Sequence, residues 1–178
     1  FVAGFNLALI PQYDVNVVKR YFDKYNVTAW AVVPAMITKL LRAKALDHKR
    51  FGKLDVIWCG GDVLPESMVE QVDGILAKYS KRPARIMRGY GLTETCGVCA
   101  VNNYDYYAPN SCGKPIDGCK IRIFGDDGSV LPPNAVGEIA LTASGVMSGY
   151  LGGGEEWTDD GYLKTGDMGY LDENGFLY

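Results

Sequence analysis

The chain has 178 residues, of which 48% are hydrophobic and 22% are charged, and its formal net charge is −3. This composition is typical of a folded globular protein and too hydrophobic for a disordered one. With 18 basic residues against 21 acidic ones, the chain has no excess positive charge, so nucleic acid is not expected as a partner. The apolar runs are much shorter than the roughly 20 residues of a membrane-spanning helix, so no membrane span is expected.

The first residues, Phe1 to Gly4, have neither an initiator methionine nor the charged-then-apolar order of a signal peptide. We therefore expect this sequence to be a piece of a longer protein. The five cysteines are an odd number in a chain without a secretory signal, which indicates a reducing compartment. A cytoplasmic protein is predicted.

Two of the cysteines, Cys96 and Cys99, have the spacing of a metal or redox pair. Together with Cys112 and Cys119 they could form a four-thiolate zinc site in an interaction module. The 12 and 6 residues between the later cysteines match no standard zinc pattern, however. We prefer the interpretation that these thiols pack as small hydrophobic side chains.

Helices and strands are predicted to alternate in the first half of the chain. Apolar residues at helical spacing, β-branched runs and the positions of prolines carry this prediction. The expected helices cover residues 16–25, 35–45 and 65–79, and the expected strands cover 27–33, 54–59 and 84–87. Strands that are joined by helices pair in parallel through right-handed crossovers.

From about residue 109 the sequence changes to short β runs that are broken by Gly, Pro and Asp. The runs cover 119–124, 137–142 and 169–171, and turn signals stand at Asp126-Asp127-Gly128 and Asn174-Gly175. The predicted fold class is therefore α/β, with a parallel sheet and flanking helices followed by a small antiparallel, barrel-like region. The expected subdomains are 1–108 and 109–178.

Residues 88–95 form the most informative stretch, because they place two glycines, an aromatic ring, hydroxyls and a carboxylate at the exit of the third expected strand. Gly89 and Gly91 permit backbone angles or close approaches that a Cβ would forbid. Ligands of parallel sheets gather beyond the carboxyl ends of the strands, where the turn at Gly60-Gly61-Asp62 is also expected. A cleft for a phosphate and a metal ion, lined by both turns, is predicted.

Six motifs then occur in a fixed order: Gly60-Gly61-Asp62-Val63-Leu64, Gly89-Tyr90-Gly91-Leu92-Thr93-Glu94, Gly113-Lys114-Pro115, Gly137-Glu138-Ile139, Gly149-Tyr150-Leu151 and Tyr162-Leu163-Lys164-Thr165-Gly166-Asp167. In this order, and over essentially its whole length, the chain resembles the adenylate-forming superfamily of acyl-CoA synthetases, coumarate-CoA ligases, luciferases and peptide-synthetase adenylation domains. The resemblance implies a ligase that uses ATP and Mg²⁺ to activate a carboxylic acid as an acyl-adenylate and then transfers the acyl group to coenzyme A.

The resemblance also implies a role for individual residues in nucleotide binding. Tyr90 would lie against the adenine, and Asp167, on a tight Thr-Gly-Asp turn, would accept hydrogen bonds from two ribose hydroxyls. The nucleotide-binding residues implied are Gly61, Asp62, Val63, Gly89, Tyr90, Gly91, Thr93 and Asp167.

Two catalytic residues and an acyl pocket follow from the same resemblance. Thr93 would donate its hydroxyl to the α-phosphate, and Glu94 would hold Mg²⁺, an ion that commonly takes only one or two protein carboxylates. The acyl substrate would lie against small residues near this turn, which are Gly89, Cys96, Gly97 and Val98.

Parts of the family pattern are expected outside the 178 residues. A phosphate loop would precede Phe1, and a small C-terminal domain with a catalytic lysine would follow Tyr178 and act in cis. This piece alone is therefore predicted to have no adenylation activity.

Other interpretations remain open. The parent could be an amino-acid adenylation domain that loads a carrier protein, or a nucleotide-binding remnant without chemistry. Taken by itself, Tyr90 could be a core aromatic, and Thr93-Glu94 could cap a helix.

Overall fold

The computed structural model describes residues 4–78, 85–154 and 156–178. These residues divide into two compact units, Phe1–Ile86 and Met87–Tyr178. The expected helix end at 79 and strand start at 84 lie outside the described residues. The predicted subdomain boundary at 108/109 marks the start of the β-rich sequence and stays a prediction.

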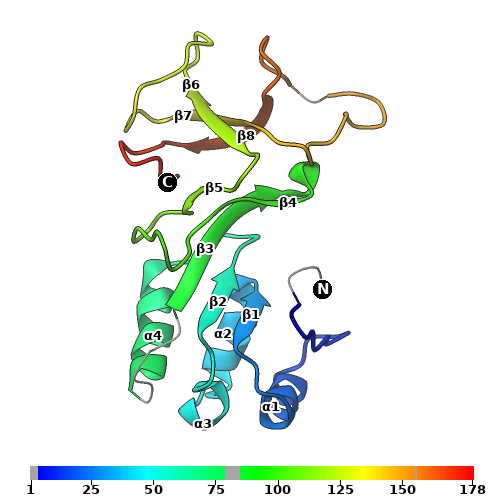
Figure 1. The fold of residues 1–178 in the computed structure, drawn as a ribbon, viewed down its shortest axis with the longest axis vertical. Helices are drawn as coiled ribbons and strands as arrows, with labels where there is room; N and C mark the ends of the chain where they lie inside the picture. The colour runs from blue at the N-terminus through cyan, green and yellow to red at the C-terminus, as the bar shows by residue number, and fades with distance from the viewer. Residues whose placement is uncertain (1–3, 79–84, 155) are drawn as a thin grey trace. The chain divides into compact units, whose positions relative to one another are not determined.

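The first unit alternates helices and strands as the sequence predicts (Figure 1). Strands β1 and β2 pair in parallel, with Ala29 opposite Val56 and Val32 opposite Cys59. A short helix, α3, was not predicted. The elements are α1 (Val15–Lys24), β1 (Ala29–Val32), α2 (Pro34–Arg42), α3 (His48–Phe51), β2 (Val56–Cys59) and α4 (Glu66–Ala77).

Local sequence accounts for the helix starts in this unit. Asp14 caps α1, because its Oδ1 accepts hydrogen bonds from the backbone N–H groups of Asn16 at 2.8 Å and Val17 at 3.1 Å. Pro34 opens α2 at a position where its missing N–H would have no helical partner.

Helices and strands of the first unit meet in one hydrophobic core. Its centre is aromatic: the Phe22 ring lies 4.3 Å from the Phe51 ring and 5.3 Å from the Trp30 ring, centroid to centroid. The unit thus buries one face of α1, α3 and the sheet together.

The second unit contains antiparallel sheet, as predicted. Strand β4 pairs with β3 and β5, and β7 pairs with β6 and β8 (Figure 1). The predicted fold class is confirmed. The elements are β3 (Arg85–Leu92), the 3-10 helix η1 (Thr93–Thr95), β4 (Gly97–Val101), β5 (Lys114–Pro115), β6 (Lys120–Phe124), β7 (Gly137–Thr142) and β8 (Leu163–Gly169).

The two predicted turns in this unit are confirmed. The Gly128 N–H donates to the Gly125 carbonyl, and the Gly175 N–H donates to the Asp172 carbonyl, at 2.9 and 3.0 Å.

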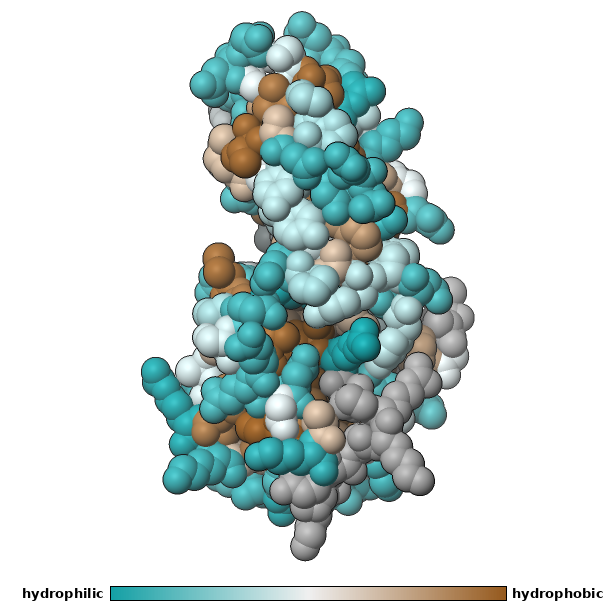
Figure 2. Space-filling model, turned by 90° about the vertical axis from the view of Figure 1, so that its left-hand side faces the viewer, coloured by the Kyte–Doolittle hydropathy of each residue, from teal (hydrophilic) through white to brown (hydrophobic). Residues whose placement is uncertain are grey.

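No described helix combines the length and the hydrophobicity that crossing a bilayer requires. On the face drawn in Figure 2, hydrophilic residues predominate and hydrophobic ones form small groups.

Candidate functional site

The Gly-Tyr-Gly segment is a strand, which corrects the expectation of a turn at the strand's exit. Gly89, Tyr90 and Gly91 continue β3 and pair with β4, with a register shift between Tyr90 and Gly91. A Cβ on Gly91 would lie only 2.0 Å from the carbonyl oxygen of Gly97. The predicted close approach is therefore present, between the backbones of β3 and β4. Glycine permits it because it has no Cβ to fill the space between the two strands.

Thr95 fixes the turn that carries the predicted catalytic residues. Its buried Oγ1 accepts a hydrogen bond from the Leu92 N–H at 3.1 Å, and it lies within donating distance of the Leu92 and Gly97 carbonyls, at 2.8 and 2.9 Å. Thr95 thereby ties η1 to the ends of β3 and β4. No role was predicted for Thr95, although a hydroxyl residue at the end of Thr-Glu-Thr is a recognisable signal of a side chain that binds the backbone of a turn.

Thr93 is exposed and Glu94 is half-buried on this turn, where neither caps an α-helix. The Tyr150 hydroxyl donates a hydrogen bond to Glu94 Oε1. The Met147 N–H donates to the Glu94 carbonyl at 2.8 Å. The Tyr150 bond is the main reason that the pKa of Glu94 lies below its usual range. The carboxylate is therefore ionised at neutral pH, as a ligand for a hard cation must be.

Asp167 lies in a strand and not on the tight turn that was predicted. Strand β8 includes Thr165, Gly166 and Asp167, and its pairing with β7 is irregular at this point. Gly166 has a φ of +76°, which favours glycine. The Thr165-Gly166-Asp167 segment resembles a turn in sequence because an irregular strand pairing uses the same residue types as a turn.

Tyr90 and Asp167 contact each other directly within the second unit. The Tyr90 hydroxyl donates a hydrogen bond of 2.7 Å to Asp167 Oδ2. Burial is the largest cause that raises the pKa of Tyr90, and the bond to Asp167 raises it further. The phenol therefore keeps its proton and acts as a donor. The structure brings together two residues that sequence analysis assigned to one nucleotide.

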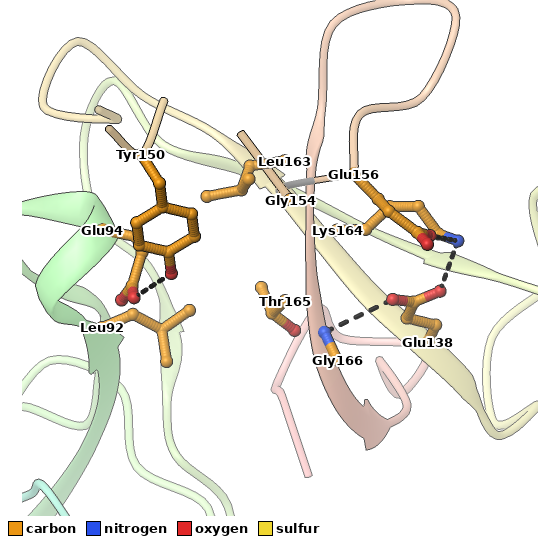
Figure 3. Close-up of a pocket in the computed structure, with 10 residues that line it drawn as sticks. All are labelled: Leu92, Glu94, Glu138, Tyr150, Gly154, Glu156, Leu163, Lys164, Thr165 and Gly166. Atoms are coloured by element: carbon orange, nitrogen blue, oxygen red, sulfur yellow. Dashed lines mark hydrogen bonds and ion pairs between the residues drawn. The ribbon is translucent and has the colours of Figure 1, made fainter. Parts of the chain in front are cut away.

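A cavity of about 400 Å³ in the second unit has Glu94 in its lining but neither Tyr90 nor Asp167. Figure 3 shows Glu94 and Tyr150 on one side of it, facing Lys164, Glu138 and Glu156 on the other. Its volume is in the range of small-molecule sites. The lining residues are Leu92, Glu94, Glu138, Tyr150, Gly154, Glu156, Leu163, Lys164, Thr165 and Gly166.

Lys164 is held between two carboxylates on the wall of this cavity. Its Nζ lies 2.9 Å from Glu138 Oε2 and 2.9 Å from Glu156 Oε2. The bond to Glu138, followed by the bond to Glu156, raises the pKa of Lys164 to about 12. Tyr150, Glu138 and Lys164 belong to motifs that sequence analysis noted, but their partners are distant in the sequence, and no role was assigned to them.

Two residues of the predicted acyl pocket are neighbours. A Cβ on Gly89 would lie 3.7 Å from Val98 Cγ1, so these residues are neighbours, although the residue opposite Gly89 in the ladder is Val101. Cys96 and Gly97 are exposed where η1 leads into β4. Their role in acyl binding stays a prediction.

The remaining predicted nucleotide contacts, Gly61, Asp62 and Val63, belong to the first unit and follow β2. Gly61 has a φ of +84°. The Asp62 Oδ1 accepts a hydrogen bond from the Val63 N–H at 2.7 Å, and Val63 is 82% exposed. Their adenine contact also stays a prediction.

The cysteines are free thiols. Cys99 and Cys119 are buried in the core of the second unit, whereas Cys96 is exposed. Across the described ranges, no group of three or more His, Cys, Asp and Glu side chains is arranged to hold a metal ion. The buried Cys99 and Cys119 pack as small apolar side chains, which is the preferred interpretation, whereas Cys96 does not. The absence of a zinc site stays a prediction.

Sequence relatives of the chain are coenzyme A ligases. It is 34% identical over 181 residues to a 2-succinylbenzoate–CoA ligase of Bacillus mycoides (strain KBAB4), an alignment that covers 98% of this chain and 36% of the relative. It is 31% identical to the ligase of the same name from Enterococcus faecalis (strain ATCC 700802 / V583), with 99% and 36% coverage. The chain thus spans about a third of the length of these relatives.

Solved structures of adenylate-forming enzymes have the same fold. The o-succinylbenzoate CoA synthetase of Bacillus subtilis in complex with AMP matches with a TM-score of 0.73 at 28% identity, over 94% of this chain and 34% of that one. ATP-bound MatB from Rhodopseudomonas palustris matches with a TM-score of 0.82 at 24% identity, over 96% and 33%. The sequence profile of the family described as AMP-binding enzyme matches residues 1–151. This chain belongs to the AMP-binding enzyme family.

Proposed function

We propose that this chain is the central part of an AMP-forming acid–thiol ligase, which activates a carboxylic acid with ATP as an acyl-adenylate and transfers the acyl group to coenzyme A. The observation that carries the proposal is the Tyr90–Asp167 hydrogen bond, because it joins the two side chains of the resemblance that would meet the adenosine. The coenzyme A ligases among the relatives support it.

At the nucleotide end, the half-buried Tyr90 would present its ring to the adenine, while Asp167 would bind the ribose. A carboxylate has about four lone-pair sites, so Asp167 can accept bonds from a ribose diol in addition to the bond from Tyr90. The family resemblance also assigns Gly61, Asp62 and Val63 of the first unit to adenine binding. Gly89 and Gly91 would allow the backbone to approach the nucleotide.

At the phosphate end, the exposed Thr93 would donate its hydroxyl to the α-phosphate. The ionised Glu94 carboxylate fits Mg²⁺, which prefers oxygen ligands and completes its octahedron with water and substrate phosphate oxygens. When bound, the ion would neutralise charge on the phosphates. Glu94 would hold the ion and Thr95 would hold the turn, so that both groups keep their places.

The acid substrate would lie near Gly89, Cys96, Gly97 and Val98. Small side chains at these positions suit an elongated or aromatic acid. The relatives named as 2-succinylbenzoate–CoA ligases make an aromatic dicarboxylic acid the first substrate to test.

The five free thiols suit a reducing, cytoplasmic setting.

The ligase reaction would also require a phosphate loop and a C-terminal domain with a lysine, supplied in cis by the longer protein. Positioning and charge stabilisation at the α-phosphate dominate this kind of chemistry, and those parts would supply much of the positive charge. The 178 residues alone would therefore not adenylate an acid.

ATP–pyrophosphate exchange in the full-length protein tests the proposal. A panel of aromatic, fatty and amino acids is assayed with Mg²⁺ and ATP, and then with coenzyme A. Exchange with a carboxylic acid, followed by thioester formation, supports the ligase. Exchange only with amino acids would favour a carrier-loading domain, and ATP binding without exchange would favour a non-catalytic protein. The isolated 178-residue chain is expected to show no exchange.

A further inference from the structure

Strand β8 contains a large bulge at the residues that precede and include Asp167. In the pairing with β7, Glu138 lies opposite Met168 and Ala140 lies opposite Lys164. Two steps along β7, from 138 to 140, therefore match four steps along β8, from 164 to 168. The residues from Thr165 to Asp167 are displaced from the regular ladder. Bulges of this kind re-aim side chains next to active sites.

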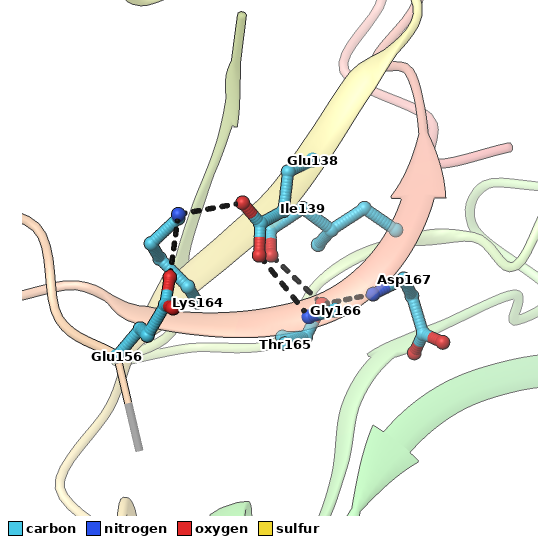
Figure 4. A network of polar contacts seen from close by, with 7 residues as sticks. All are labelled: Glu138, Ile139, Glu156, Lys164, Thr165, Gly166 and Asp167. Atoms are coloured by element: carbon cyan, nitrogen blue, oxygen red, sulfur yellow. Dashed lines mark hydrogen bonds and ion pairs between the residues drawn. The ribbon is translucent and has the colours of Figure 1, made fainter. Parts of the chain in front are cut away.

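Side chains bind the backbone groups that the bulge removes from the ladder (Figure 4). The Gly166 N–H donates to Glu138 Oε1 at 3.3 Å. The Thr165 hydroxyl donates to the Ile139 carbonyl at 2.8 Å and accepts from the Asp167 N–H at 3.1 Å. Two of these bonds tie the bulge to β7, and the third joins Thr165 to Asp167 within the bulge. Side chains therefore satisfy the Gly166 and Asp167 N–H groups and restrain the bulge.

Lys164 fixes the second oxygen of Glu138. The Nζ–Oε2 distance is 2.9 Å, and both side chains are only about a quarter exposed, at 28% and 26%. Because one carboxylate oxygen binds Lys164 and the other binds the Gly166 N–H, the Glu138 side chain has little rotational freedom left.

We propose that Glu138 is a positioning residue for ribose recognition: held by Lys164, it clamps the Thr165–Asp167 bulge so that the Asp167 carboxylate meets the ribose hydroxyls. The proposal rests on the proposed function, in which Asp167 binds the ribose. Glu138 itself would touch no substrate atom at the ribose. It acts through the backbone of Gly166.

A merely structural role for this ion pair would give a different result. If Glu138 only strengthened the β7–β8 pairing, its loss would lower stability and would affect ATP and its deoxy analogues alike. If Glu138 positions Asp167, its loss removes a benefit that exists only when the ribose hydroxyls are present. Discrimination between ATP and its deoxy analogues therefore separates the two roles.

The experiment measures acid-dependent pyrophosphate exchange in the full-length protein with ATP, 2′-deoxy-ATP and 3′-deoxy-ATP. In Glu138→Gln, we expect KM for ATP to rise about tenfold, with a smaller change in kcat, and the preference for ATP over the deoxy analogues to fall toward that of Asp167→Asn. Asp160→Asn is the matched control, because it neutralises the carboxylate of another ion pair, with Arg122, that does not touch the bulge. Its discrimination should equal that of the wild type.

A second pair of variants keeps the test valid if Glu138→Gln does not fold. Lys164→Arg preserves the cation and should keep the discrimination, whereas Lys164→Gln releases Glu138 and should reduce it. Full discrimination in Glu138→Gln, or in Lys164→Gln, would overturn the proposal. If the wild type lacks exchange activity, or Asp167→Asn discriminates as well as the wild type, the proposed function of Asp167 fails first and the positioning role fails with it.

Discussion

Tyr90 and Asp167 are 77 positions apart in the sequence, yet the Tyr90 hydroxyl donates a hydrogen bond of 2.7 Å to Asp167 Oδ2. Burial raises the pKa of the phenol, so the donor stays protonated over the physiological range. The bond joins β3 to the bulge of β8. One contact thus restrains both the Tyr90 ring and the Asp167 carboxylate, the two groups that the proposed function assigns to the nucleoside.

Removing this donor tests the contact without removing the ring. We expect Tyr90→Phe to lower the free energy of unfolding by about 1 kcal/mol, the usual net worth of a hydrogen bond at a partly exposed site. Urea denaturation measures the change. Tyr21→Phe is the control, since the Tyr21 hydroxyl has no hydrogen-bond partner in the described part of the chain, and its change should stay within about 0.5 kcal/mol. Equal stability of both variants would contradict the contact.

Replacing glycine by alanine should lower the free energy of unfolding at Gly91 and raise it at Gly74. A Cβ at Gly91 would lie 2.0 Å from the Gly97 carbonyl oxygen, and backbone must move to relieve that overlap. We expect Gly91→Ala to cost about 3 kcal/mol of unfolding free energy. Gly74 lies in α4, and a Cβ there would have no atom of the described residues within 4 Å. We expect Gly74→Ala to add about 0.5–1 kcal/mol, because alanine is the better helix former.

Urea denaturation of both glycine variants checks these signs in one experiment. A Gly91→Ala protein as stable as the wild type would show that β3 and β4 are not as close as the structure has them. A Gly74→Ala protein less stable than the wild type would show that α4 packs something against that position.

Sequence alone predicted the elements whose pattern is local. Helix α1 was placed to within one residue by its apolar spacing, and β7 was predicted with the bounds that the structure has. Strand β3 was predicted only as far as residue 87, and the run predicted at 169–171 overlaps β8 only at Gly169. Both errors arise because Gly-Tyr-Gly and Thr-Gly-Asp look like turns when only neighbours in sequence are considered. Their strand character depends on pairing with distant segments, β4 and β7.

The candidate site likewise contains residues that the sequence motifs indicate and contacts that only the tertiary structure shows. The order of motifs led to Glu94, Tyr90 and Asp167, whose roles stay predictions. It gave no indication that Tyr150 binds Glu94 or that Glu138 binds the backbone of Gly166, because these partners are 56 and 28 positions apart. Such pairs follow from tertiary packing, and no spacing rule of helices or strands reaches them.

Thr95 should be the structural support of the η1 turn. In Thr95→Val the side-chain volume is kept and the hydroxyl is lost, which leaves the Leu92 N–H without its partner. We expect a cost of about 2 kcal/mol, because an unpaired buried donor keeps its desolvation penalty. Thr95→Ser keeps the hydroxyl and should cost about 1 kcal/mol for the lost methyl group.

Hydrogen exchange reports the local effect of these Thr95 variants. The Leu92 amide should exchange faster in Thr95→Val than in Thr95→Ser. If both variants protect this amide equally, the turn is held by packing and not by the hydroxyl.

The Tyr150–Glu94 bond predicts a pH dependence whose sign can be worked out. The donated bond favours the carboxylate, so the folded pKa of Glu94 lies below the ordinary value of about 4.3. Its stabilising contribution is complete above that ordinary value and is lost as pH falls through the folded pKa. In Tyr150→Phe we therefore expect the pKa of Glu94 to rise toward the ordinary value.

Carbon-13 NMR of the Glu94 side-chain carboxyl, followed as a function of pH, measures this shift. Tyr170→Phe is the control, because Tyr170 stacks on Tyr178 and is not part of the Glu94 contact, so the Glu94 titration should not change. If Glu94 is the Mg²⁺ ligand, adding the ion should lower its apparent pKa in the wild type and in Tyr150→Phe alike, because cation and proton compete for one carboxylate. An unchanged titration in Tyr150→Phe would mean that the tyrosine does not hold Glu94 in solution, and a titration insensitive to Mg²⁺ in both proteins would remove Glu94 as the ligand.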